Sequence, residues 1–261
     1  MWLQKRIQSP RQFQYCWKSR KKKKGGTYPT RSKEERGRGI GDRASHRKKK
    51  LPRFSLMADG EKPLRKIAAS FKDLAAAVNS QNPEVKVEVA PFSAACSHVS
   101  VLFGCLGIAF KFAEMDYVAK VDDLTKAANS IGTLKSLLDH DIEQGTVRKA
   151  GSHSRNLLRV KRGLDMVRVL FEQILASEES SLKSPASVAY AQVFAPHHGW
   201  AIRKAVAAGM YALPTRAQLL KKLNEDAESA RIQMQSYISA SALVIQYIDK
   251  LFLSKELGID W

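Results

Sequence analysis

Apolar residues recur at steps of three and four along most of this chain, which is the spacing of an amphipathic helix. The clearest example is residues 154–175, SRNLLRVKRGLDMVRVLFEQIL, where the apolar positions form one stripe. We expect this stripe to face the core and the polar positions to face solvent. The stripe consists of Leu157, Leu158, Leu164, Val167, Leu170, Phe171 and Ile174.

The same period continues on both sides of that segment and predicts eight or nine helices with short links, hence an all-α domain. The best strand candidate, VKVEV at residues 85–89, is short and stands between Pro83 and Pro91. The expected helices cover approximately residues 64–78, 91–113, 115–130, 133–144, 154–177, 184–195, 198–212, 214–224 and 226–253.

Residues 1–56 differ from the rest in charge. They carry 19 of the 44 Lys and Arg residues but only 3 of the 25 Asp and Glu residues, so their net charge is +16 and that of the remainder is +3. We expect a disordered basic leader, because so few apolar residues cannot offset the entropy cost of ordering. It is untranslated sequence read as protein, a nuclear or transit signal, or a nucleic-acid-binding arm. The folded domain is expected at residues 57–261.

Cysteine usage and hydropathy indicate a soluble intracellular protein. The three cysteines, Cys16, Cys96 and Cys105, have no metal-binding spacing and suit a reducing compartment. The longest apolar run, residues 98–113, is interrupted by Lys111 and is too short to cross a membrane. We therefore expect this run to be a buried helix of a cytosolic protein.

Known catalytic and cofactor motifs are absent from the sequence. It contains no GxSxG, HExxH, P-loop or GxGxxG pattern. His197 and His198 are adjacent, but no carboxylate or third ligand stands near them in the sequence. We expect no catalytic residues, no metal, no cofactor and no enzymatic activity.

Two pairs of polar residues do indicate a binding site. Arg155 and Arg159 are four residues apart at the border of the apolar stripe, so their guanidinium groups share one helix face and suit a phosphate. Asp116 and Lys120 are also four residues apart. The alternatives are a solvated basic face for the arginines and an exposed ion pair for Asp116 and Lys120.

Three features in a fixed order resemble the glycolipid transfer protein family. They are the Asp-x-x-x-Lys pair, the run VKRGLD at residues 160–165, and HGW at residues 198–200 followed by YALP at residues 211–214. The resemblance extends over residues 69–261. It implies a two-layer sandwich of about eight helices, with sphingolipid chains between the layers and the headgroup at the surface.

The resemblance also indicates which headgroup is bound. Glycolipid-selective members carry a Trp, on which a sugar stacks, at the position that Arg159 occupies here. The replacement of this platform by a cation, with Arg155 one turn earlier, resembles the ceramide-1-phosphate transfer branch. Within that branch, DYVAKVDDL and HHGW look closest to plant sequences.

Residue roles follow from the same resemblance. Lys120, Arg155 and Arg159 would bind the phosphate, Asp116 would accept a hydrogen bond from the ceramide amide N–H, and His198 would pair with the amide carbonyl. Arg162 either belongs to the same cluster or is structural, and the resemblance favours a structural or orienting role. We expect Trp200 to pack beneath His198, with exposure toward a membrane as the alternative. The lipid chains would lie against Phe103, Leu106, Phe110, Leu164, Val167, Leu170 and Phe171.

The expected function is non-enzymatic transfer of ceramide-1-phosphate between membranes by a monomer that contacts membranes transiently. Candidate residues for that contact are basic side chains beside two aromatic ones. The alternatives are a sphingolipid sensor that regulates lipid signalling and cell death, a nucleic-acid binder acting through the leader, and an enzyme. The contact candidates are Lys204, Arg216, Lys221 and Lys222, with Trp200 and Tyr211, and their alternative is an ordinary solvated face.

Overall fold

The computed structural model describes residues 62–80 and 86–261. The chain divides into two units, Met1–Phe54 and Ser55–Trp261, and the described residues all belong to the second. The basic leader of residues 1–56 lies outside the described part, so its disorder and its alternative roles stay predictions, as does the start of the domain at Met57.

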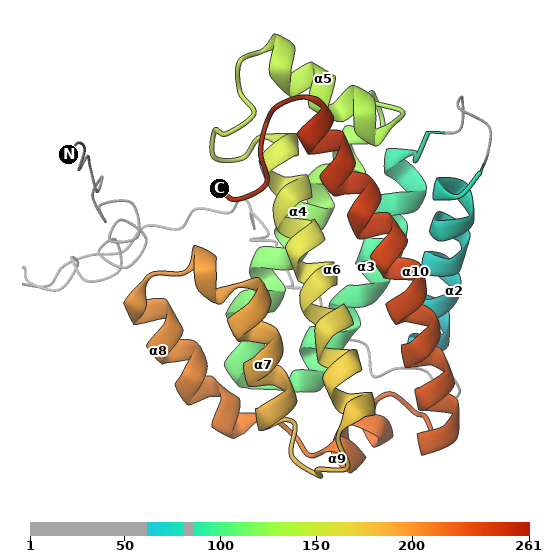
Figure 1. Ribbon diagram of the computed structural model, residues 1–261, viewed down its shortest axis with the longest axis vertical. Helices are drawn as coiled ribbons and strands as arrows, with labels where there is room; N and C mark the ends of the chain where they lie inside the picture. Colours follow the sequence, from blue (N-terminus) through green and yellow to red (C-terminus); the bar gives the residue numbers. More distant parts are fainter. Residues whose placement is uncertain (1–61, 81–85) are drawn as a thin grey trace, which may run out of the picture. The chain divides into compact units, whose positions relative to one another are not determined.

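Helices account for all the regular secondary structure in the described residues, so the all-α prediction is confirmed (Figure 1). Three short 3-10 helices interrupt the series: η1 (Ile108–Phe110), η2 (Ala195–His197) and η3 (Met210–Ala212). The α-helices are α2 (Pro63–Val78), α3 (Val89–Leu106), α4 (Lys111–Ala127), α5 (Leu134–Glu143), α6 (His153–Ala176), α7 (Lys183–Val193), α8 (Trp200–Gly209), α9 (Arg216–Lys222) and α10 (Ala227–Ser254).

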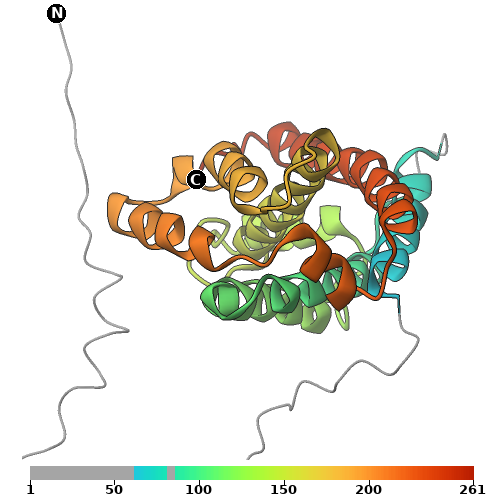
Figure 2. The ribbon, with the colours of Figure 1, turned by 90° about the horizontal axis from the view of Figure 1, so that it is seen from below.

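The long helices pack in two layers. In Figure 2, α7, α6 and α10 lie side by side in one layer, α3 and α4 lie in the other, and α2 closes the edge between α10 and α3. Helix α6 contacts α4 across the layers as well as its neighbours α7 and α10. The two-layer prediction is therefore confirmed, and the polar beginning of α6 lies next to α4.

Aromatic contacts join α2, α6 and α10 in the core. Tyr237 is fully buried, and its ring makes edge-to-face contacts with Phe71 at 4.9 Å and Phe171 at 5.6 Å between centroids. Its hydroxyl donates a hydrogen bond to the Leu164 carbonyl at 3.0 Å. A buried tyrosine needs such a partner, because an unpaired hydroxyl in the core is costly.

The predicted helix over residues 91–113 is wrong at its C-terminal end. Helix α3 stops at Leu106, because Gly107 has a φ of +99°, a conformation that other residues rarely adopt. The chain then forms η1 and begins α4 at Lys111. Within the described ranges α3 alone is long and apolar enough to cross a membrane by length and composition, but here it packs between α2 and α4.

The weak strand candidate at residues 85–89 contributes only a single antiparallel bridge, between Glu88 and Thr133. The Val89 N–H donates to the Gly132 carbonyl, and the Leu134 N–H donates to the Val87 carbonyl, both at 2.9 Å. The bridge holds the beginnings of α3 and α5 together. Residue 85 itself lies outside the described ranges.

Short polar side chains set where several helices begin. Each accepts a hydrogen bond from the backbone N–H three residues later, which satisfies a donor that the helix itself leaves free. These residues act at the first turn, so the sequence period locates the helix and the cap fixes its first residue. The capping residues are Thr133 for α5, Ser152 for α6, Thr215 for α9 and Asp226 for α10.

Candidate functional site

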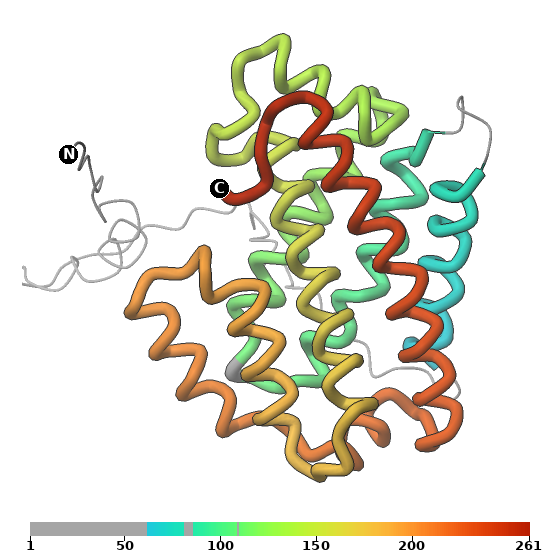
Figure 3. Tube along the Cα trace, in the orientation of Figure 1, coloured from blue at the N-terminus to red at the C-terminus, as the bar shows by residue number. Residues whose placement is uncertain are grey.

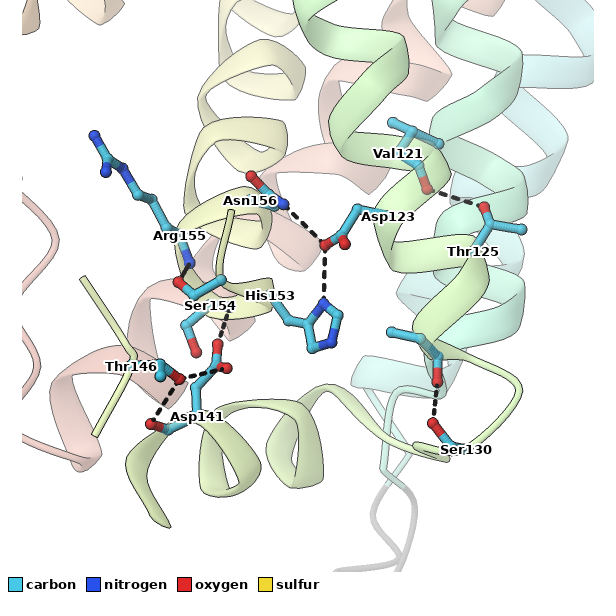
Figure 4. A network of polar contacts seen from close by, with 12 residues as sticks. Val121, Asp123, Thr125, Ser130, Asp141, Thr146, His153, Ser154, Arg155 and Asn156 are labelled. Carbon is cyan, nitrogen blue, oxygen red and sulfur yellow. Dashed lines mark hydrogen bonds and ion pairs between the residues drawn. The ribbon is translucent and has the colours of Figure 1, made fainter. Parts of the chain in front are cut away.

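Two buried polar side chains fix the first turn of α6, which carries Arg155 (Figure 4). The Ser152 hydroxyl accepts a hydrogen bond from the Arg155 N–H at 3.3 Å. The Asp141 carboxylate, from α5, accepts one from the Ser154 N–H at 2.6 Å. A carboxylate in this place also interacts favourably with the helix dipole. The direction of α6 at the site is therefore set by α5 and by the cap.

A second carboxylate joins α6 to α4 in the same network. Asp123 Oδ2 accepts a hydrogen bond from Asn156 Nδ2 at 2.8 Å and lies 2.9 Å from His153 Nδ1 (Figure 4). These residues hold the two helices that carry the predicted headgroup ligands. The sequence pattern did not predict this network. Ser152, which precedes α6, is nevertheless a residue type typical of helix N-caps.

We predict that Asp141→Ala destabilises the protein by about 1–3 kcal/mol, because the Ser154 N–H and the Thr146 hydroxyl lose a buried acceptor. Urea unfolding of the full chain measures this change. Asp122→Ala is the matched control, since Asp122 is exposed on α4. Equal unfolding midpoints for the two variants would show that the Asp141 cap does not stabilise α6.

Arg155 and Arg159 lie close enough for their charges to interact. Burial lowers the pKa of the Arg159 guanidinium, the positive charge of Arg155 lowers it further, and the negative charge of Asp116 opposes both. Figure 4 shows the Arg155 side chain extending away from the capping network. Two neighbouring cations with little compensating charge are an unfavourable arrangement that a bound anion relieves. By accessible surface Arg155 is half-buried and Arg159 is exposed, since the surrounding groups remove only part of the hydration of Arg159. The solvated-face alternative and the phosphate-binding role therefore both stay predictions.

Asp116 and Lys120 contact each other on α4. Lys120 Nζ donates to the Asp116 carboxylate and, at 3.1 Å, to the Asp116 carbonyl. The Lys120 side chain is only 11% exposed, whereas that of Asp116 is 67% exposed, so the pair is not a fully solvated one. Because Asp116 also acts electrostatically on Arg159, the α4 pair lies beside the α6 arginines.

His198 completes the set from the link between η2 and α8. Its Nδ1 lies 2.9 Å from the Tyr190 hydroxyl, and its ring stacks on Phe194 at 5.5 Å between centroids. Burial lowers the pKa of His198, and Arg159 lowers it further against the opposing charge of Asp116. The imidazole is therefore neutral at neutral pH. The structure thus brings together the five predicted headgroup residues, which come from three separate parts of the chain.

The prediction that Trp200 packs beneath His198 is wrong. Trp200 is 69% exposed, and Phe194 provides the ring against which His198 stacks. The His198 backbone is extended, with φ −108° and ψ 134°, and Gly199 caps a new helix that begins at Trp200. This change of backbone direction places the His198 and Trp200 side chains in different environments.

Arg162 binds the C-terminal segment and not the anion site. Its Nη2 donates to the carbonyls of Ile259 and Trp261, both at 2.7 Å. Figure 3 shows the segment after α10 turning back toward the beginning of α6. Burial and the charge of Arg159 lower the pKa of Arg162, while Asp260 opposes this effect. These contacts are those of the structural role that the resemblance implies.

The seven predicted chain-pocket residues lie in or beside the core. Leu164, Val167, Leu170 and Phe171 are buried in the hydrophobic cluster. A role in binding lipid chains stays a prediction for all seven, because the same contacts also stabilise the fold. No group of His, Cys, Asp or Glu in the part that the structure describes is arranged to hold a metal ion. Phe103, Leu106 and Phe110 are partly buried and pack against the cluster.

Comparisons with known proteins identify the family of this chain. The glycolipid transfer protein family model matches residues 87–225. The plant protein accelerated cell death 11 of Arabidopsis thaliana is 71% identical over 208 residues, which cover 78% of this chain and all of that relative. The ceramide-1-phosphate transfer protein of Danio rerio is 31% identical over 157 residues, which cover 56% of this chain and 74% of the relative.

A solved structure is similar as well. The crystal structure of an aspartate-to-asparagine mutant of Arabidopsis accelerated-cell-death 11, complexed with C12 ceramide-1-phosphate, superposes with a TM-score of 0.76 at 70% identity. The match covers 78% of this chain and all of that one. Sequence, fold and the order of the site residues lead to one conclusion: this chain belongs to the glycolipid transfer protein family.

Proposed function

We propose that this protein carries ceramide-1-phosphate between membranes without changing it chemically. The observation that supports the proposal is the electrostatic interaction of Arg159 with both Arg155 and Asp116, the ion-pair partner of Lys120, at the border of an apolar helix face. The crystallised relative that is 70% identical binds a ceramide-1-phosphate, which supports the same ligand class here.

The phosphate would be bound by the three cations. Its oxygens accept charge-assisted hydrogen bonds from the guanidinium groups of Arg155 and Arg159, which lie one helical turn apart. Lys120 Nζ is now bonded to Asp116 and would turn part of its donor capacity to the phosphate. Binding a dianion between these groups also removes the repulsion between the two arginines.

The amide of the ceramide would be read by Asp116 and His198. The Asp116 carboxylate accepts from the amide N–H, and the His198 imidazole donates to the amide carbonyl. A glycerol ester has no N–H, so its binding would leave the carboxylate without that donor. An unsatisfied charged group costs more than a neutral one, which makes Asp116 the selective partner.

Exposed apolar side chains near the site support transient contact with a membrane. Ile108 and Phe112 are 86% and 85% exposed. A Cβ added to Gly107 would lie 3.9 Å from the Ala212 carbonyl, so η1 lies beside η3 and its exposed Tyr211. Such side chains bury area in a lipid surface when the protein docks. The proposed carrier acts as a cytosolic monomer that leaves the membrane with its lipid.

The basic residues expected at this surface divide into two groups. Arg216 donates to the Ser177 carbonyl at 2.8 Å, and Lys222 donates to the Cys105 carbonyl at 2.9 Å. These two side chains therefore stabilise the fold. Lys204 and Lys221 are exposed and remain the candidates for attraction to anionic lipid.

A protein of this kind lowers the barrier to lipid escape. Each buried CH2 group stabilises a lipid in its membrane by about 0.8 kcal/mol, so a lipid with two long chains leaves very slowly by itself. If apolar side chains of the protein bind the lipid chains while the protein is docked, the chains leave the membrane without being exposed to water. No bond is made or broken in this process, and no proton transfer is required.

Transfer of fluorescent lipids between vesicles by the full chain tests the proposal. Ceramide-1-phosphate, a glycosylceramide and phosphatidic acid are compared at equal concentration. We predict that ceramide-1-phosphate is transferred at least about tenfold faster than phosphatidic acid, because the ester lacks the donor for Asp116. The glycosylceramide is expected to be slower still, since it offers no anion to the arginines.

Each contrary result identifies a different error. Equal transfer of phosphatidic acid would show that Asp116 and His198 do not select the amide. Preferential transfer of the glycosylceramide would contradict the assignment of the cations to a phosphate. Tight binding of ceramide-1-phosphate with no transfer would replace the carrier by a sensor that regulates lipid signalling and cell death.

A further inference from the structure

Tyr190 is the hydrogen-bonding partner of the site histidine. It lies on α7, eight residues before His198, and its hydroxyl is 2.9 Å from His198 Nδ1. The two rings are also in contact, with centroids 5.7 Å apart. Phe194 stacks on the imidazole at an interplanar angle of 14°. The imidazole is thus held at one nitrogen and by the two aromatic rings.

This contact determines where the imidazole proton lies. A neutral imidazole carries one N–H, at either Nδ1 or Nε2, and the partner of one nitrogen decides the state of the other. A phenolic O–H is a better donor than a neutral imidazole N–H, and an imidazole nitrogen is a better acceptor than a phenolic oxygen. Tyr190 therefore donates to Nδ1, and the proton of His198 lies on Nε2.

The surrounding charges leave this arrangement intact. Burial raises the pKa of Tyr190 against the opposing charge of Arg203 on α8, so the hydroxyl keeps its proton. His198 interacts with Arg159 and Arg162 on α6 and with Asp116 on α4. Its lowered pKa keeps it neutral, which is the state in which the choice between the two nitrogens matters.

We propose that Tyr190 is a positioning residue that holds His198 as the Nε2–H tautomer and so provides the site with a donor for a carbonyl oxygen. With the other tautomer, Nε2 would present a lone pair and repel that oxygen. Asp116 then supplies the acceptor and His198 the donor, which together complement a secondary amide. This inference rests on the proposed function for its ligand, but the tautomer itself exists without one.

Nitrogen NMR of the full chain labelled with 15N-histidine tests the tautomer without any lipid. The ring signals of His198 are those that disappear in His198→Gln. We expect the wild-type shifts and couplings of the Nε2–H form, and a shift toward a mixture of both forms in Tyr190→Phe. A wild-type Nδ1–H form, or a tautomer unchanged in Tyr190→Phe, overturns the proposal.

A double-mutant cycle then tests whether Tyr190 acts through His198. Tyr190→Phe is expected to slow ceramide-1-phosphate transfer about three- to tenfold, the effect of losing one hydrogen bond. In the His198→Gln background the same change should cause no further loss, because its target is gone. An equal loss in both backgrounds would show a general structural role and overturn the proposal.

The control is the same tyrosine-to-phenylalanine substitution at another position of the chain. Tyr247→Phe removes a hydroxyl from α10 and should leave both the His198 tautomer and the transfer rate unchanged. A similar tautomer change in Tyr247→Phe would count against the specific role of Tyr190. If the tautomer result holds but the unsubstituted chain transfers no lipid, the proposed function fails and the role of Tyr190 stands.

Discussion

Replacing Arg159 with leucine is expected to slow ceramide-1-phosphate transfer by roughly ten- to a hundredfold, the effect of losing hydrogen bonds to a charged group. Leucine keeps much of the apolar stem of the side chain and removes its donors. The remaining cations, Arg155 one turn earlier and Lys120 on α4, cannot replace the second guanidinium group. Phosphate recognition by a pair of guanidinium groups depends on both members.

Transfer between vesicles and equilibrium binding of the same fluorescent lipid measure this effect. Arg231→Leu is the matched control, because Arg231 pairs with Glu228 on the exposed first turn of α10. Arg159→Lys should fall between the wild type and Arg159→Leu, since an ammonium keeps the charge but not the planar fork. Wild-type transfer by Arg159→Leu would contradict the phosphate assignment.

The largest expected loss of stability comes from substituting Gly163, in the centre of α6. A Cβ at this position would lie 2.7 Å from Cε2 and 2.8 Å from Cδ2 of Tyr117 on α4. Tyr117 has little room to move, because it is buried and its hydroxyl donates to the Cys96 carbonyl at 3.1 Å. Gly163→Ala is therefore expected to cost about 1–3 kcal/mol, and Gly163→Val more.

Urea unfolding of the full chain provides the comparison. Gly132→Ala is the control, since an added Cβ there meets no atom within 4 Å. Combining Gly163→Ala with Tyr117→Leu should recover part of the loss, because the smaller side chain makes room for the new methyl group. A midpoint for Gly163→Ala equal to that of Gly132→Ala would show that α4 and α6 can separate without cost.

Gly163 also connects stability to the site. It stands in the VKRGLD run, one turn after Arg159, and is itself buried. Its missing side chain lets α6 approach α4, which carries Asp116 and Lys120. The close approach therefore sets the separation between α4 and α6. We predict that the glycine acts through this packing on the proposed headgroup binding.

Much of this protein was predictable from local patterns. The three- and four-residue period of apolar positions located the helices, because a helix buries one face at that repeat. The same repeat put Arg155 with Arg159, and Asp116 with Lys120, on common faces. The order of the motifs then indicated the family, and with it the two-layer arrangement.

The tertiary structure decided what the period leaves open. The apolar repeat defines which face of a helix is buried but not which element packs on that face. It therefore did not predict that Asp123 and Asp141 bind α6, or that Arg162 binds the C-terminal segment. The apolar period also did not predict the backbone direction at two positions. The positive φ at Gly107 divides one apolar run between two helices, and the extended residue before α8 leaves Trp200 exposed.

The sequence by itself determined an all-α chain with paired cations at the edge of an apolar helix face, because these properties depend on neighbours within one or two turns. Only the tertiary structure decided that the pairs face one another and that Tyr190 contacts His198. These contacts join helices that are distant in the chain. Their geometry depends on how whole helices pack, which no local repeat encodes.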